Sequence, residues 1–457
     1  MSSSTQSKTP IHRDPSTRLY VIVVGAGLGG IGAAISLLLA GHSVRILEAS
    51  SEIGEVGAGI QILPNSSRVL QSWGLRERLE EYATKPSRVN MRGWKGNLIS
   101  YLDTEESAAK YPGTFYWDFH RANLHRVLLE RAVELGAEIT TQARVVDVRI
   151  PGGDSAQTAT VVCQSGNEYV ADLVVGADGI NSRLREILVG RADPPIPTGD
   201  LAYRLLLSTA DMLKDPELAS FVQEPQVNYW LGPDAHAVNY VLRGGELFNM
   251  VLLVPDDMPP GSANTLAGDV EEMRALYKDW DPRIPKLLAL CESVYKWRLQ
   301  IRVGMDCWSH PSGTLTMLGD AVHATLPYLA SGAGMCLEDA AVLGELFSRA
   351  PDPKNPEVKK QLLDLYERCR KDRTEMIVKR GNLQQYLYHL HDGPEQQERD
   401  RKMAAKEPGE ALAWRDSELA PVLLGYQVEK DVDRYWPPPC LQDRAGGSAS
   451  SAVASRL

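Results

Sequence analysis

Cysteine is scarce in this sequence, and its spacing excludes a metal site or a disulfide framework. No C-x-x-C pair occurs, and the six cysteines are Cys163, Cys291, Cys307, Cys336, Cys369 and Cys440. Scattered cysteines are typical of reduced thiols in an intracellular protein. The nine histidines show no ligand spacing beyond His389 and His391, which lie in a polar stretch, so we predict no bound metal.

Dense basic runs and a signal peptide are also missing. The 457 residues carry a formal net charge of -10, which gives no support for nucleic-acid binding. Residues 1–18 are rich in Ser and Thr, lack an apolar core and are predicted to be disordered. Residues 20–44 are apolar enough to raise a membrane span as an alternative. Their glycines, with Ser36 and His42, fit a βαβ unit better, so no integral membrane segment is predicted.

Three glycines, Gly25, Gly27 and Gly30, follow a β-branched strand-like run at residues 20–24 and open a predicted helix. The first suits a tight turn, the second lets backbone approach a pyrophosphate, and the third lets the helix pack closely on the strand. Glu48 ends the next predicted strand, where its carboxylate can accept hydrogen bonds from ribose hydroxyls. The pattern predicts an ADP-binding unit for FAD or NAD, and the choice between them stays open.

Two later strands also end in an acid. Residues 173–175 run into the turn that contains Asp178 and Gly179, and residues 314–318 run into Gly319 and Asp320. Such turns place a carboxylate at the carboxyl edge of a sheet, where α/β proteins bind ligands.

The glycine-rich stretch at residues 54–65, which contains Gly59, lets backbone lie flat against a planar ligand; a plain surface loop is the alternative. Arg121 falls in the first turn of a helix predicted over residues 120–135, an unfavourable place for a cation. A ligand phosphate or carboxylate would explain it, and a surface salt bridge is the alternative.

Residues 201–254 change to strand-like alternation, with strands predicted at 202–207, 226–231, 237–242 and 248–254. The predicted fold is α/β: a Rossmann-like domain at residues 19–185 and 301–395, with C-terminal helices and an antiparallel sheet domain inserted at 186–300. Further helices are predicted at 67–81, 270–280, 285–290, 335–349 and 358–380, and a β-meander at 137–171. Residues 396–444 remain unassigned.

The last residues, 445–457, form a predicted flexible tail that ends in Ser455, Arg456 and Leu457. This ending matches a peroxisomal address of the S-K-L type, with Arg in place of Lys. The sequence therefore predicts a peroxisomal or cytoplasmic protein, with the peroxisomal import receptor as a partner in the first case.

Together, the glycine fingerprint, the Asp178-Gly179 turn and Gly319-Asp320 followed by Pro327 and Gly332 resemble the single-component FAD-dependent aromatic hydroxylases. The likeness covers residues 18–385 and is to the salicylate-hydroxylase-like group, which includes paraben and phenol hydroxylases and fungal secondary-metabolite monooxygenases. One departure is Ala330-Ser331-Gly332, where the family often has Gly-Gln-Gly. The backbone of this segment can still face the flavin, but the Gln side chain is absent.

The resemblance implies a role for each cofactor-binding residue. Glu48 would hold the adenosine ribose, Arg121 a flavin hydroxyl or phosphate, and Asp320 the region of the ribityl chain and pyrophosphate. The turn of Asp178 and Gly179 would contact pyrophosphate and NAD(P)H. The backbone of Gly332, Ala333 and Gly334 would face the flavin N1/C2 edge, where reduced flavin is anionic.

The implied reaction uses NAD(P)H to reduce FAD, then O2 to form a flavin C4a-hydroperoxide that hydroxylates a phenolic or other aromatic small molecule. Arg204 and Tyr240 resemble the Arg and Tyr that fungal phenol hydroxylases direct at the phenol; the alternative makes Arg204 structural and Tyr240 a core aromatic. Tyr229 and His236 are further candidate pocket residues. His323 is expected to pack and cap.

Three other functions are consistent with parts of the pattern. The same fold and cofactor also suit an epoxidase or oxidase of a non-aromatic metabolite. A simple NAD-dependent dehydrogenase would explain the first glycine motif. The late Gly319-Asp320 motif and the lack of a catalytic Lys/His/Tyr constellation count against it. A catalytically silent flavin-binding partner protein has only Ser331 in its favour. No second glycine fingerprint follows a strand, so no separate nicotinamide domain is predicted.

Overall fold

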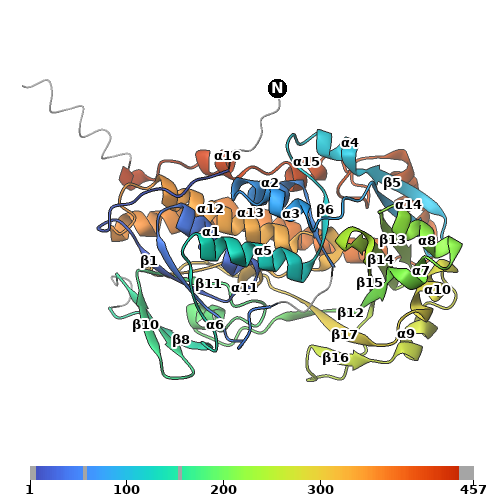
Figure 1. Cartoon of the computed structure of the whole chain (residues 1–457), viewed down its shortest axis with the longest axis horizontal. Coiled ribbons are helices and arrows are strands. Elements are labelled where there is room, and N and C mark those ends of the chain that lie inside the picture. Colours follow the sequence, from blue (N-terminus) through green and yellow to red (C-terminus); the bar gives the residue numbers. More distant parts are fainter. Residues whose placement is uncertain (1–6, 55–58, 153–156, 442–457) are drawn as a thin grey trace, which may run out of the picture.

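The computed structural model describes residues 7–54, 59–152 and 157–441 and has two lobes (Figure 1). One lobe is built on a five-stranded parallel sheet. From edge to edge its strands are β18 (Leu315–Met317), β11 (Leu173–Gly176), β1 (Tyr20–Val24), β2 (Ser43–Leu47) and β7 (Glu138–Thr140). The β-branched run predicted as a strand is β1, and it pairs with β2 and β11.

The second lobe is built on an eight-stranded, mainly antiparallel sheet. Its strands in order are β16 (Thr265–Gly268), β17 (Val294–Ile301), β12 (Ile196–Ser208), β15 (Leu247–Pro255), β14 (Ala235–Leu242), β13 (Val227–Gly232), β4 (Arg88–Gly93) and β5 (Leu98–Asp103). The four predicted strands are confirmed as β12 to β15. The sheet is not made by the inserted segment alone, because β4 and β5 join it and β4 pairs in parallel with β13.

The remaining strands form two small sheets. One contains β10 (Glu168–Ala171), β9 (Ala159–Cys163) and β8 (Val145–Arg149), and the other β3 (Gly59–Ile62) and β6 (Trp117–His120). The predicted meander is therefore only partly right. Its first strand, β7, extends the parallel sheet beside β2, because its residues pair there with Arg45, Ile46 and Leu47.

Helices cover both sheets and connect the lobes (Figure 1). In the first half of the chain they are α1 (Leu28–Leu39), α2 (Pro64–Ser72), α3 (Arg76–Glu80), α4 (Thr104–Ala109), α5 (Arg121–Glu134), α6 (Arg183–Val189), α7 (Thr209–Met212) and α8 (Pro216–Gln223). In the second half they are α9 (Val270–Leu276), α10 (Arg283–Ala289), α11 (Asp320–His323), α12 (Gly332–Arg349), α13 (Pro356–Tyr388), α14 (Pro394–Ala405), α15 (Leu419–Leu424) and α16 (Val428–Asp433). Short 3-10 turns are η2 (Arg243–Gly245) and η3 (Pro327–Leu329).

The helix predicted over residues 67–81 is two helices. Gly74, with φ of +77°, separates α2 from α3 because this left-handed conformation ends the first helix. The predicted α/β fold with an antiparallel sheet and C-terminal helices is otherwise confirmed. The previously unassigned residues 396–441 contribute most of α14 and all of α15 and α16.

The N-terminal segment is ordered from residue 7 onward, in contrast to the predicted disorder up to residue 18. The Arg13 guanidinium donates to the carbonyl oxygens of Ala40 at 2.7 Å and Ala350 at 2.8 Å, and its side chain is buried. The segment is held because Arg13 caps backbone carbonyls near the ends of α1 and α12. Residues 1–6 and the C-terminal Ser455, Arg456 and Leu457 lie outside the described residues.

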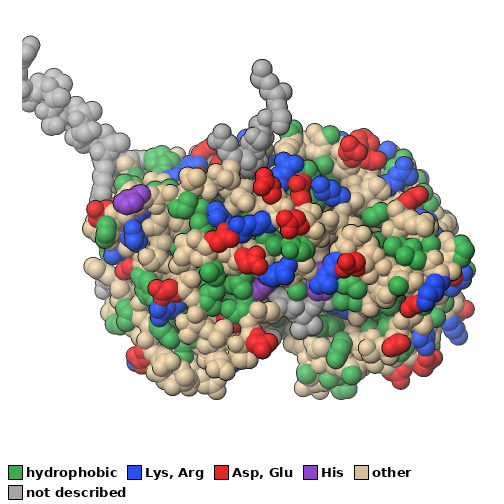
Figure 2. Space-filling model, in the orientation of Figure 1, with side chains coloured by type: hydrophobic (Ala, Val, Ile, Leu, Met, Phe, Trp, Pro, Cys, Tyr) green, Lys and Arg blue, Asp and Glu red, His purple; other side chains and the backbone are tan. Residues whose placement is uncertain are grey.

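In the described part of the chain, no helix is long and apolar enough to cross a membrane. No group of three or more His, Cys, Asp or Glu side chains in that part could hold a metal ion. Acidic and basic side chains are interspersed over the visible face (Figure 2), which agrees with the absence of dense basic runs in the sequence.

Helices α1 and α12 pack closely because small residues lie between them. A Cβ atom added at Gly32 would lie 3.2 Å from the Cβ of Ala340, and one at Gly344 would lie 2.5 Å from the Cβ of Ser36. Position 344 therefore needs glycine for this separation of the helices, and position 32 would accept a methyl group only if its neighbours moved slightly.

A buried ion cluster fixes α12 against α13. Arg370 is fully buried and donates to Glu338 at 2.7 Å and to Asp339 at 2.8 Å. Arg373 also donates to Glu338, and His323 contacts Asp339 at 2.6 Å. Burial alone would raise the pKa of Asp339, but the charges of His323 and Arg370 outweigh it and lower this pKa to about 2.

We predict that Arg370→Met lowers the free energy of unfolding by about 3–5 kcal/mol, because it leaves two buried carboxylates without their shared cation. Urea denaturation followed by circular dichroism measures the change. Arg401→Met is the control, since the ion pairs of Arg401 with Glu398 and Glu407 are exposed and the variant should unfold like the wild type. Equal unfolding of the Arg370 variant and the control would contradict the prediction.

Candidate active site

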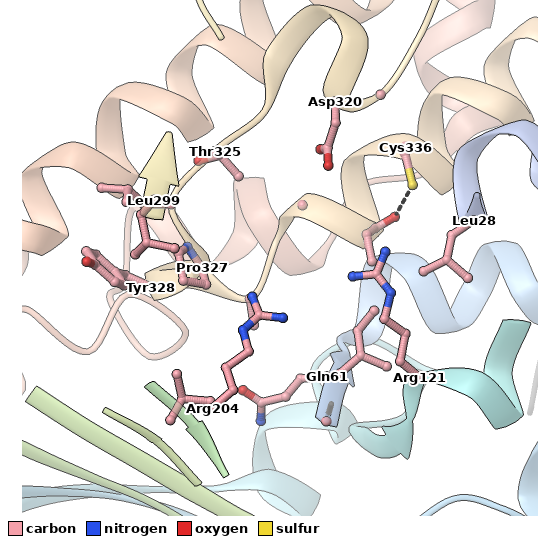
Figure 3. Close-up of a pocket in the computed structure, with 18 of the residues that line it drawn as sticks. Leu28, Gln61, Arg121, Arg204, Leu299, Asp320, Thr325, Pro327, Tyr328 and Cys336 are labelled. Atoms are coloured by element: carbon pink, nitrogen blue, oxygen red, sulfur yellow. Dashed lines mark hydrogen bonds between the residues drawn. The ribbon is translucent and has the colours of Figure 1, made fainter. Parts of the chain in front are cut away.

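A cavity of about 380 Å³ lies between the two lobes, where the N-termini of α1 and α12 meet the large antiparallel sheet (Figure 3). It brings together residues from distant parts of the sequence. The predicted site residues on its wall are Gly27, Gly59, Arg121, Gly179, Arg204, Tyr240, Asp320, Gly332 and Ala333, together with Tyr229 and His236.

Two glycines of the fingerprint are packed against backbone atoms, and the third borders open space. Gly25 has φ of +104°, and a Cβ there would lie 2.3 Å from the carbonyl oxygen of Ala177. A Cβ at Gly30 would lie 2.0 Å from the carbonyl oxygen of Gly25, so neither position accepts a side chain. A Cβ at Gly27 would meet no protein atom within 4 Å, and Gly27 lines the cavity at the start of α1. The space beside Gly27 and the free N–H groups of the helix suit a pyrophosphate.

The carboxylates of Glu48 and Asp178 are turned toward backbone N–H groups. Glu48 accepts from Ala26 at 2.9 Å, so it lies against the glycine turn at the end of β2. Asp178 accepts from the Ser182 hydroxyl and from the N–H groups of Arg183 and Leu184, at the start of α6. Asp178 therefore shapes its turn, while the neighbouring Gly179 lines the cavity.

Helix α12 begins three residues earlier than expected, at Gly332. Gly332 and Ala333 line the cavity, so the helix N-terminus opens onto it. Gly334 faces α2 instead: a Cβ there would lie 3.2 Å from the Asn65 amide nitrogen. Gly334 therefore lies off the cavity wall, whereas Gly332 and Ala333 lie on it.

Two arginines reach into the cavity, with Asp320 across from them (Figure 3). Arg121 comes from the first turn of α5, as predicted, and Arg204 comes from β12. The Arg204 guanidinium lies 5.1 Å from the centre of the Trp297 ring, and its Nε is buried with no hydrogen-bond partner among the described residues. Burial, with the charge of Arg121 adding to it, lowers the pKa of Arg204, although the group stays cationic at neutral pH. A partnerless buried donor beside a cavity indicates an anionic or polar ligand.

Tyr240 lies on β14, 5% exposed, and packs directly on β3. A Cβ at Gly59 would lie 2.6 Å from the Tyr240 hydroxyl oxygen, and the Gly59 N–H donates to Asn249 at 2.8 Å. Gly59 thus serves the close approach of β3 to the tyrosine. Burial raises the pKa of Tyr240, nearby Asp118 raises it further and Arg204 opposes this, so the phenol stays protonated and can donate.

Several residues at the site were not predicted from the sequence. Tyr328 lines the cavity, and its hydroxyl donates to Asp200. His389, behind the cavity wall, contacts His236. Tyr328 directly follows Pro327 of the Gly319-Asp320 motif region, and this neighbourhood could have indicated it. No local sequence pattern marks Asp200 or His389. His323 is buried and contacts the Asp339 carboxylate, which agrees with the packing part of its expected role.

The comparison with protein families identifies the fold. Residues 18–381 match the model of the FAD binding domain family, which spans the parallel sheet, the antiparallel sheet and most of α13. The open position at Gly27, the two helix N-termini and the acid after β2 provide a fitting cradle for FAD. The chain belongs to this FAD-binding family.

Known relatives show which kind of FAD-binding enzyme the chain resembles. The chain is 41% identical to the FAD-dependent monooxygenase OpS4 of Beauveria bassiana over 90% of this chain and 95% of that protein. It is 34% identical to 3-hydroxybenzoate 6-hydroxylase of Polaromonas naphthalenivorans over 82% of this chain and 90% of that protein. A salicylate hydroxylase structure shares the fold, with a TM-score of 0.75 at 22% identity over 91% of this chain and 98% of that one. The protein is an FAD-dependent monooxygenase.

We predict that Gly27→Ala weakens FAD binding about tenfold or more, equivalent to about 1.4 kcal/mol, without changing the melting temperature of the apoprotein. The added methyl group enters only the cavity. Gly30→Ala is the matched variant, in which the methyl group meets Gly25 and lowers the free energy of unfolding by about 1–3 kcal/mol. Flavin fluorescence titration and thermal melting of both apoproteins measure the two effects. Unchanged FAD affinity in Gly27→Ala would place the cofactor elsewhere.

Proposed function

We propose that the protein uses NAD(P)H and O2 to hydroxylate a phenolic or other aromatic small molecule. The observation that carries this proposal is the partnerless Nε of Arg204 in a cavity that Tyr240 also lines, together with the apolar side chains of Val238, Val251 and Leu299. Apolar side chains accept an aromatic ring, while a buried cation and a hydroxyl donor stabilise the negative charge of a phenolate. Relatives named for 3-hydroxybenzoate and 3-amino-4-hydroxybenzoate support the same substrate class.

The side chains of the antiparallel sheet perform the substrate half of the reaction. Arg204 binds the phenolate oxygen and lowers the pKa of the substrate hydroxyl, which makes the ring more electron-rich. Protonated Tyr240 donates a hydrogen bond and orients the ring. Val238, Val251 and Leu299 line the same region and exclude water.

The parallel-sheet side holds the cofactor. The N-termini of α1 and α12 present backbone N–H groups to the pyrophosphate and to the anionic edge of the flavin ring, respectively. Bound FAD supplies the chemistry of accepting hydride from NAD(P)H and activating O2. Arg121 and Asp320 lie on the cavity wall between these termini and hold polar groups of the cofactor.

An assay with FAD-loaded protein tests the function. NADPH or NADH oxidation is followed with and without salicylate, 3-hydroxybenzoate and 3-amino-4-hydroxybenzoate, and products are analysed by mass spectrometry under isotopically heavy O2. We expect faster NAD(P)H oxidation with a phenol and one heavy oxygen atom in the product. Oxidation of only non-aromatic compounds, or loss of the flavin colour on purification, would overturn the proposal.

We predict that Arg204→Met lowers kcat/KM for the converted phenol roughly 30-fold, because a charge-assisted contact worth about 2 kcal/mol is lost. The variant should keep its bound FAD. Arg88→Met is the control, since Arg88 lies exposed on β4 of the same sheet, over Tyr101 and away from the cavity. If Arg204→Met instead loses FAD and converts phenol normally once FAD is supplied, Arg204 serves the cofactor and not the substrate.

We also propose that the protein is imported into peroxisomes through Ser455, Arg456 and Leu457. The support is the match of these three residues to the S-K-L type of address at the end of the chain. A fluorescent protein fused to the N-terminus should appear in peroxisomes and move to the cytosol when the three residues are deleted. Cytosolic fluorescence of the full-length fusion would favour the cytoplasmic alternative.

A further inference from the structure

A further polar side chain, that of Gln61 on β3, lies on the cavity wall. Figure 3 shows it on the same side of the cavity as Arg204 and Arg121, across from Asp320. The amide Nε2 of Gln61 donates to Oδ1 of Asp118 at 3.1 Å. Because a Gln amide has its donor on one side and its acceptor on the other, this bond leaves the carbonyl oxygen Oε1 for the cavity.

The geometry of β3 places Gln61 at the substrate end of the cavity. A Cβ at Gly59 would lie 2.5 Å from the Tyr240 ring and 2.7 Å from the Asn249 side chain, so this face of β3 packs on β14 and β15. Side chains two residues apart on a strand point to the same face. Gln61 therefore points toward the antiparallel sheet, which also carries Arg204.

Asp118, the partner of Gln61, is held in place by its backbone. It pairs with Gln61 across the ladder of β3 and β6, and its N–H donates to the carbonyl oxygen of Thr84 at 2.8 Å. Its own carbonyl oxygen accepts from the Thr84 N–H at 2.9 Å. Asp118 is 2% exposed, so its carboxyl group is a buried acceptor with a fixed position.

The environment of Asp118 keeps the carboxyl group neutral near pH 7. Its Oδ2 is buried and has no hydrogen-bond partner among the described residues, where no cation pairs with it. Burial raises the pKa of Asp118 to about 8, although the Gln61 amide opposes this shift. A neutral carboxyl can orient a side-chain amide without placing a buried charge beside the substrate.

The arginines favour the same orientation of the Gln61 amide. Arg204 and Arg121 carry donors and no acceptor atom. Their positive charge attracts a carbonyl oxygen and repels an NH2 group, so Oε1 is the favourable end of the amide on the cavity side. The amide is thus oriented before a ligand arrives, which lowers the entropy cost of binding.

The cavity therefore offers a cation and a neutral acceptor on one wall. A ligand atom that contacts Arg204 must be an acceptor or an anion, whereas a ligand group that contacts Gln61 must be an N–H or O–H donor. A phenol with a second hydroxyl or an amino group on its ring matches both. A ring with an apolar group at this position would bury Oε1 without a partner, which is unfavourable.

We propose that Gln61 determines substrate specificity, and that its amide oxygen selects phenols with a second ring hydroxyl or amino group. Asp118 is the positioning residue that orients the amide. This inference rests on the proposed aromatic hydroxylation and names a narrower class of substrate for it. The N3–H group of the flavin ring is a donor of the same kind, and the variants below separate this source from the substrate.

Matched pairs of ring compounds test the proposal. 3-Amino-4-hydroxybenzoate is compared with 3-methyl-4-hydroxybenzoate, and 3,5-dihydroxybenzoate with 3-hydroxy-5-methylbenzoate, because a methyl group has nearly the size of the donor that it replaces. Dissociation constants are measured from the change in flavin absorbance of the oxidised holoenzyme, and kcat/KM from product formation. We expect the wild type to prefer the donor compound of at least one pair about tenfold, since the methyl compound leaves a polar atom unpaired.

The decisive variant is Gln61→Met, which keeps the length of the side chain but removes the amide. We expect the preference within that pair to disappear, because the donor compound loses about tenfold in affinity while the methyl compound loses none. Comparing the ratio within a pair between two proteins cancels the effect of the substituent on the reactivity of the ring. Gln397→Met is the matched control, since Gln397 is exposed on α14 and the variant should keep the wild-type preference.

Asp118→Asn tests the positioning role. The Asn amide can present either its oxygen or its NH2 group to Gln61, so the Gln61 amide can turn over and the preference should fall to about threefold. FAD content and melting temperature should match the wild type. A merely structural role of Asp118 would lower the melting temperature and leave the ratio within each pair unchanged, which would contradict the positioning role.

The outcomes separate this inference from the proposed function. If the wild type converts no phenol, the proposed function fails and the specificity proposal fails with it. If the wild type converts a phenol and Gln61→Met keeps the wild-type preference, the specificity proposal alone is wrong. An equal loss for both compounds of a pair would mean that Gln61 orients Arg204, and weaker FAD binding with an unchanged preference would assign the amide to the flavin N3–H. Either result would also overturn the specificity proposal.

Discussion

The close packing of α1 against α12 is the constraint on which the site depends. Glycine at position 344, with little free space at Gly32, allows the two helices to approach, and both then begin at the same cavity. Helix N-termini carry partial positive charge and free N–H groups. An acidic chain with a net charge of -10 can therefore bind the anionic parts of FAD through local backbone dipoles, without a cluster of lysines.

The buried charges behind α12 support this arrangement. Arg370 of α13 neutralises Glu338 and Asp339 on the inner face of α12, and Asp339 also accepts the N–H of Gly319 at 3.0 Å. One carboxylate thus connects α12, α13 and the turn that presents Asp320. Because ion pairs in a dry interior tolerate little change in geometry, the cluster holds these three elements in a single relative position.

The two lobes contribute in different ways to the chemistry. In the proposed reaction, the parallel-sheet lobe acts largely through backbone, at Gly27, Gly332 and Ala333. The antiparallel sheet acts there through side chains, with Arg204 on β12 and Tyr240 on β14. Side chains can change without altering the sheet, so relatives of this fold can keep the cofactor site and differ in substrate. The long helix α13 links the halves and ends at Tyr388, so that the next residue, His389, lies behind the cavity wall.

The sequence by itself determined the local elements. Strand β1, the glycine turn and helix α1 lie within 20 residues of one another. The alternation of polar and apolar residues along β12 to β15 shows which residues share a face of the sheet. These signals are readable because they depend on spacing along the chain. From them came the fold class, a dinucleotide cofactor of the FAD or NAD type and several of the residues on the cavity wall.

Only the tertiary structure decided which elements meet. The parallel pairing of β4 with β13, the turning of Gly334 toward α2 and the contact of His236 with His389 join segments far apart in sequence. Local periodicity indicates that a face is buried but does not name the partner that covers it, because that choice is made by long-range packing. The cofactor cradle was therefore visible in the sequence, and the groups behind the substrate wall were not.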